Sequence, residues 1–94
     1  MQKDITEKKN LIKRALAATM RECRGEQSLF KYSSENDIPL SIVSEAERGL
    51  KDPQLTTIFK MAEAYSLSPG TFVDKIASKL PPKFSISKYK RAGG

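Results

Sequence analysis

Histidine and tryptophan are absent from the 94-residue chain, and cysteine occurs once, at Cys23. The absence of histidine removes the commonest general base and metal ligand, so neither a Ser-His-Asp nor a Cys-His site can form. A single cysteine allows no intramolecular disulfide and no Cys-based zinc site. No apolar run approaches the roughly 18 residues of a membrane span, and no signal-peptide core follows the N-terminus. We expect no metal, no cofactor, no membrane partner and a cytoplasmic location.

Acidic residues are scarce at the two ends of the chain, although the net charge is only +6. Residues 1–31 carry eight Lys/Arg and four Asp/Glu, and residues 75–94 carry six Lys/Arg and no acid. Residues 32–74 carry three Lys/Arg against seven Asp/Glu. The charge therefore favours an anionic partner such as nucleic acid at the ends of the chain and not in the middle.

Five short helices are expected, because apolar residues recur at helical spacing between start and stop signals. Ser28 is typical of an N-cap, and Asp52-Pro53 and Ser68-Pro69 each combine a cap with a first-turn proline. The spacing predicts an all-α domain. Its helices are expected over residues 6–23, 29–35, 39–48, 53–65 and 69–80.

Residues 1–80 are predicted to form one helical domain and residues 81–94 a basic tail. Apolar and polar residues alternate over 84–87, which suits a short strand. A disordered end explains the same segment. Two functional interpretations of the tail stay open. It could form a strand that pairs two copies of the chain, or a basic arm that binds phosphate.

Several larger side chains are expected in the core because they lie on the apolar helix faces. They are Met20, Cys23, Phe59, Met61, Tyr65, Phe72, Val73, Ile76, Ala77 and Leu80.

The stretches 28–35 and 39–48, joined by residues 36–38, have the dimensions of a helix-turn-helix. The pattern continues with Glu47-Arg48-Gly49, a proline at 53, and Leu55-x-x-Ile58-x-x-Met61-Ala62-x-x-Tyr65-x-Leu67. Over residues 10–77 the chain resembles the phage-repressor (Cro/CI, XRE-type) helix-turn-helix family. The resemblance implies a five-helix, lambda-repressor-like fold whose third helix enters the DNA major groove.

The same resemblance assigns roles to individual residues. It implies a structural ion pair between Arg21 and Glu47, which would fix the third helix against the first. The base-contacting positions would be Leu40, Ser41, Ser44 and Glu45. The phosphate-contacting positions would be Ser28, Arg48, Lys51 and Gln54.

The chain also departs from the family pattern. Leu29 stands where a phosphate-holding Gln is frequent, Ser33 replaces a small Ala, and Asp37 replaces the Gly of the turn. The predicted reading face has no Arg, Lys, Asn or Gln, the side chains that make the commonest bidentate base contacts. Serine still bonds to either kind of base, a glutamate accepts from a cytosine amino group, and a leucine contacts a thymine methyl.

The sequence favours sequence-specific binding of double-stranded DNA by a small transcriptional regulator of the repressor type, acting as a homodimer. The rival interpretation is a protein-interaction module on the same scaffold, with Leu29, Leu40 and Ile42 exposed together as an apolar patch. An enzyme is not expected. Paired acids such as Glu45 and Glu47 point to different faces of a helix, and no glycine-rich phosphate loop is present.

Overall fold

The structure, a computed structural model, describes the backbone of residues 2–86 and the side chains of residues 5–86. Over this range the chain is all-α, with five helices and no strand, as predicted. The helices are α1 (Gln2–Arg24), α2 (Leu29–Asn36), α3 (Leu40–Glu47), α4 (Leu55–Ala64) and α5 (Pro69–Ala77).

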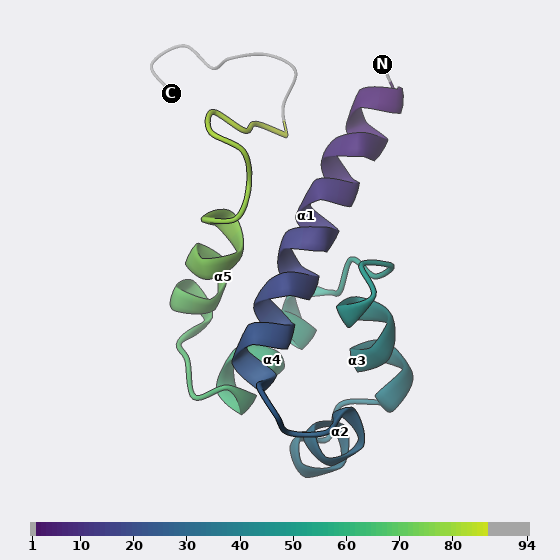
Figure 1. Cartoon of the computed structure of the whole chain (residues 1–94), viewed down its shortest axis with the longest axis vertical. Helices are drawn as coiled ribbons and strands as arrows, with labels where there is room; N and C mark the ends of the chain where they lie inside the picture. Colours follow the sequence, from purple (N-terminus) through teal and green to yellow (C-terminus); the bar gives the residue numbers. More distant parts are fainter. Residues whose placement is uncertain (1, 87–94) are drawn as a thin grey trace.

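Helix α1 organises the arrangement. It is 23 residues long and starts before the predicted residue 6. In Figure 1 it runs between α3 on one side and α5 on the other, and its N-terminal half projects beyond the other helices. Helices α3 and α5 both pack on it. Of the two helices of the predicted helix-turn-helix, α3 therefore rests on α1, whereas α2 lies beyond the C-terminal end of α1 and packs on α3 and α4.

Two of the predicted helix starts are confirmed by their capping bonds. The Ser28 side chain accepts a hydrogen bond from the Lys31 amide, and the Ser68 side chain accepts one from the Thr71 amide. Each bond satisfies an amide that the helix itself leaves unpaired.

The predicted start of α4 is wrong by two residues. Gln54 is extended, with φ −65° and ψ 156°, so α4 begins only at Leu55. The residue before a proline disfavours the helical conformation, which explains why Asp52 is not helical. In this chain Gln54, the residue after Pro53, is not helical either. Gln54 is the N-cap of α4, and its side chain makes no capping hydrogen bond.

The core is a single cluster drawn from all five helices. Its largest fully buried side chains are Met20, Tyr32, Val43, Met61 and Phe72. The rings of Tyr32 and Tyr65 stack with centroids 4.9 Å apart, so α2 is held against the end of α4.

Some residues predicted for the core lie at the surface instead. Phe59, Val73 and Ala77 are exposed, and Cys23 and Leu80 are only partly buried. The short helices α4 and α5 each bury one narrow stripe, which contains Met61 and Ala62 on α4 and Phe72 and Ile76 on α5. The described part of the predicted tail strand, residues 84–86, is not a strand, and residues 87–94 lie outside the described residues.

A buried carboxylate fixes α3 against α1. The Glu47 side chain is 5% exposed and is held by the Arg24 guanidinium, with Nε 2.6 Å from Oε2 and Nη2 2.8 Å from Oε1. The predicted partner, Arg21, instead donates from Nη1 to the main-chain carbonyl of Glu47. The sequence therefore identified the acid, but the arginine on its carboxylate lies one turn later in α1.

We expect Arg24→Ala to lower the free energy of unfolding by about 3 kcal/mol, because it leaves a buried carboxylate without its counter-charge. Arg21→Ala removes one hydrogen bond and should cost about 1 kcal/mol. Urea denaturation followed by circular dichroism measures both values. Arg48→Ala, at an exposed position just past α3, is the control and should stay within about 0.5 kcal/mol of the parent. Equal losses for Arg21→Ala and Arg24→Ala would contradict the assignment.

The stacked tyrosines predict alkaline instability. Burial raises the pKa of Tyr32 from 10.0 to about 12 and also raises the pKa of Tyr65. The unfolded chain therefore loses these protons first as the pH rises. Stability is fully present below about pH 10 and should fall by about 2 kcal/mol for Tyr32 alone as the pH reaches about 12. In Tyr32→Phe the same measurement, chemical denaturation at stepped pH, should show a smaller fall. An identical pH profile in the two proteins would exclude this origin.

Candidate nucleic-acid interface

The turn between α2 and α3 is built around Ser33 and Asp37. Asp37 adopts the left-handed conformation, with φ 55° and ψ 44°, which aspartate tolerates better than most residues. The buried Ser33 hydroxyl donates to the Ile38 carbonyl, and the Ile38 amide donates back to the Ser33 carbonyl at 3.2 Å. Ser33 therefore supports the turn through hydrogen bonds to Ile38, and Asp37 supplies its left-handed residue.

Helix α3 presents one face to the core and one to the outside. Val43 and Ala46 are completely buried. The four predicted base-contacting residues share the opposite face, where Leu40 and Ser41 are exposed and Ser44 and Glu45 are partly exposed. The structure brings this predicted set together on one surface.

The four predicted phosphate-contacting residues are not brought together. The Ser28 hydroxyl already caps α2, and Arg48 is exposed at the C-terminal end of α3. Lys51 and Gln54 are neighbours in the segment that links α3 to α4. The Lys51 Nζ lies 3.4 Å from Oε1 of Glu45, so a predicted phosphate contact is paired with a predicted base contact.

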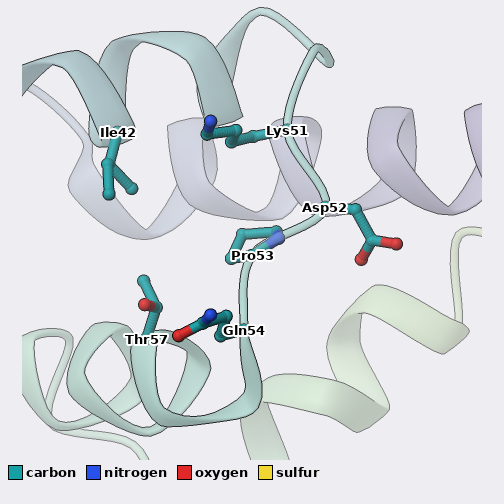
Figure 2. A pocket seen from close by; sticks show the side chains of 6 residues that line it. All are labelled: Ile42, Lys51, Asp52, Pro53, Gln54 and Thr57. Carbon is teal, nitrogen blue, oxygen red and sulfur yellow. The ribbon is translucent and has the colours of Figure 1, made fainter.

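A cleft of about 340 Å³ lies between α3 and the start of α4. Figure 2 shows Ile42 on the α3 side and Gln54 and Thr57 on the α4 side, with the Lys51 side chain lying along the α3 side of the gap. Asp52 also belongs to the lining, although its side chain points away from the gap in Figure 2. The cleft therefore combines one ammonium group, one amide and one hydroxyl at a helix start with one carboxylate at its edge.

The start of α4 is suited to an anion. The first amides of a helix lack partners inside the helix and carry partial positive charge. The Gln54 side chain does not cap them. Sequence reasoning missed Thr57, because the predicted start at Pro53 placed it in the second turn of the helix instead of the first.

The apolar patch on which the rival interpretation depended does not form. Leu29 and Ile42 are partly buried and pack against the core. Leu40 alone of the three is exposed, at 44%.

Large apolar side chains gather instead where α4 meets α5. Leu55 is 70% exposed, Phe59 47% and Val73 45%. Beside them a groove of about 210 Å³ opens between α1, α4 and α5. Its apolar lining residues are Ile12, Leu16, Leu55, Ile58, Val73 and Ile76. We call the exposed side chains and this groove the α4–α5 face; the helical periodicity placed Phe59 and Val73 in the core and so did not reveal it.

Two further features bear on the class of protein. Among residues 2–86 no helix is long and apolar enough to cross a membrane. The same part of the chain contains no group of three or more His, Cys, Asp or Glu side chains arranged to hold a metal ion.

No family model, no curated protein and no solved structure matches this chain. The class that the fold defines is an all-α domain of five helices.

Proposed function

We propose that the protein binds double-stranded DNA in a sequence-specific manner, as a cytoplasmic transcriptional regulator of the repressor type that performs no catalysis. One observation carries the proposal. The outer face of α3 is polar and accessible, its orientation is fixed by the buried Glu47, and a cleft containing Lys51 lies directly beside it. This is the arrangement that a reading helix flanked by phosphate contacts requires.

The chemistry of the outer face sets what it can read. The hydroxyls of Ser41 and Ser44 donate to or accept from base edges, and the Leu40 side chain can contact a thymine methyl. The Glu45 carboxylate only accepts, so it suits the amino group of cytosine or adenine. With eight residues, α3 is about 12 Å long and reads only a few base pairs.

Phosphate contacts would supply most of the affinity. Lys51 provides the charge of the cleft, and Gln54 and Thr57 provide hydrogen bonds at the start of α4. Arg48, which is exposed at the end of α3 and does not line the cleft, would make a separate phosphate contact. The six basic residues among residues 75–94 add sequence-independent attraction.

A short reading helix with few strong base contacts favours two copies on one operator, and the α4–α5 face suits a second copy. This face carries two exposed side chains, Leu55 and Phe59, and an apolar groove beside them. In a dimer with a two-fold axis, the exposed side chains of each copy would enter the groove of the other copy. Residues 52–77 contain three acids and two lysines, which makes this the region where two strongly basic chains repel each other least. Figure 1 shows α5 and α3 on opposite sides of α1. The groove of the α4–α5 face shares Asp52 and Pro53 with the α3–α4 cleft, so a second copy seated there would also lie beside the proposed phosphate contacts.

Selection from a pool of random-sequence duplexes tests the DNA proposal and does not require the operator to be identified beforehand. We expect one motif to be enriched. The double variant Ser41→Ala/Ser44→Ala should bind the enriched duplex about tenfold more weakly, because two hydroxyl contacts are lost. Its affinity for the unselected pool should not change. Fluorescence anisotropy measures both, with Ser78→Ala, beyond the end of α5, as the control. Failure to enrich any sequence would contradict specific recognition.

Self-association is tested by Leu55→Asp, which introduces a charge at the centre of the α4–α5 face. Sedimentation equilibrium should show dimers for the parent protein and a dimer dissociation constant raised at least tenfold for the variant. Phe30→Asp is a matched control, because Phe30 on α2 has the same 70% exposure but lies away from this face. The proposal fails if the two variants weaken the dimer equally, or if the parent protein is a monomer at all concentrations.

A further inference from the structure

The ion pair between Glu45 and Lys51 links the reading face to the cleft. Oε1 of Glu45 and Nζ of Lys51 are 3.4 Å apart, and the side chains are 44% and 45% exposed. Helix α3 itself contains no lysine or arginine. The ammonium group beside its outer face is therefore held by the carboxylate on that face.

The two proposed DNA contacts compete with each other. A DNA phosphate that takes up Lys51 leaves the Glu45 carboxylate without a counter-ion, facing a polyanion. While Lys51 stays paired with the Glu45 carboxylate, it cannot contact a DNA phosphate. An exposed ion pair such as Glu45–Lys51 contributes little free energy, so bound DNA can separate the two side chains. Whether they separate depends on the base that faces Glu45 in the major groove.

The major groove offers a carboxylate either a donor or a repulsive acceptor. Cytosine presents the N4 amino group and adenine presents the N6 amino group, whereas the guanine and thymine edges present acceptors. When the Glu45 carboxylate faces the amino group of cytosine or adenine, it can release the Lys51 ammonium group and accept a hydrogen bond from the base instead. When it faces guanine or thymine, it finds no donor to replace Lys51.

We propose that Glu45 determines specificity by withholding Lys51 from the phosphate backbone until an amino group of cytosine or adenine occupies its carboxylate. On other sequences the pair stays closed and one phosphate contact is missing. Base recognition and phosphate binding are thereby coupled through a single ion pair. This inference rests on the proposed DNA-binding function and identifies the residue that makes it selective.

The first test uses Glu45→Gln on a random-sequence duplex pool, which requires no known operator. The amide keeps the size of the side chain and releases Lys51. We expect tighter binding to the random pool and a steeper dependence of log K on log salt, by about 0.9, the value for one added phosphate contact. Glu63→Gln is the matched control, because it makes the same change in charge at an exposed position of α4. It should leave the salt slope unchanged, and equal slopes for the two variants would overturn the proposal.

The second test separates the ion pair from general electrostatics. On the random pool, Lys51→Met should lower the affinity of the parent protein, in which Glu45 withholds the lysine, less than it lowers the affinity of the Glu45→Gln variant, and it should leave the parent's salt slope unchanged. In the Glu45→Gln background, Lys51→Met should remove the gained affinity and the added slope. Equal losses in both backgrounds would show that Lys51 contacts phosphate whatever Glu45 does, and would overturn the coupling.

The third readout is sequence preference. Parent protein selected on the random pool should enrich cytosine or adenine at one position. Glu45→Ala, which has no polar group to contact a base edge, should lose that preference while retaining the rest of the motif. Retention of the preference by Glu45→Ala contradicts the proposal. If the parent protein and every variant fail to bind any duplex at low salt, the DNA-binding function itself is wrong. Binding by the parent with no effect of Glu45→Gln would reject only the role of Glu45.

Discussion

The buried carboxylate of Glu47 is the constraint on which the arrangement of the site depends. A buried carboxylate requires a hydrogen-bonded counter-charge, and Arg24 in the last turn of α1 supplies it through two bonds. The same guanidinium donates to the Gln27 carbonyl in the loop before α2, and Arg21 donates to the Glu47 carbonyl. One polar cluster thus fixes the end of α1, the entry to α2 and the end of α3, and thereby the direction in which the outer face of α3 points.

In the proposed DNA complex, selectivity and affinity would come from different residues. The outer face of α3 is polar but has no cation of its own, so it would discriminate between bases and contribute little general affinity. Lys51 follows α3, and the other lysines and arginines are concentrated in residues 1–31 and 75–94 of the sequence. The Glu45–Lys51 pair is the contact between the proposed base-reading face and the proposed phosphate-binding cleft.

Helix number and approximate helix bounds followed from local signals, because the capping serines 28 and 68 and the helical spacing of apolar residues act within one or two turns. Other features depended on tertiary packing. Arg21 and Arg24 lie three residues apart on one face of α1, so spacing alone cannot tell which of them reaches the carboxylate. Periodicity gives the direction of an apolar stripe but not its buried width, which is why Phe59 and Val73 were placed in the core. The α3–α4 cleft lies at the start of α4, which the sequence placed two residues too early.

The most direct test of the central claim is an NMR titration of the full chain with the duplex enriched by selection. We expect amide shifts to concentrate on the outer face of α3 and on the segment from Lys51 to Thr57, while Phe30 and the rest of the outer side of α2 stay unchanged. Shifts confined to the basic ends of the chain, or equal shifts with a scrambled duplex, would contradict it. In that case α3 would not be a reading helix.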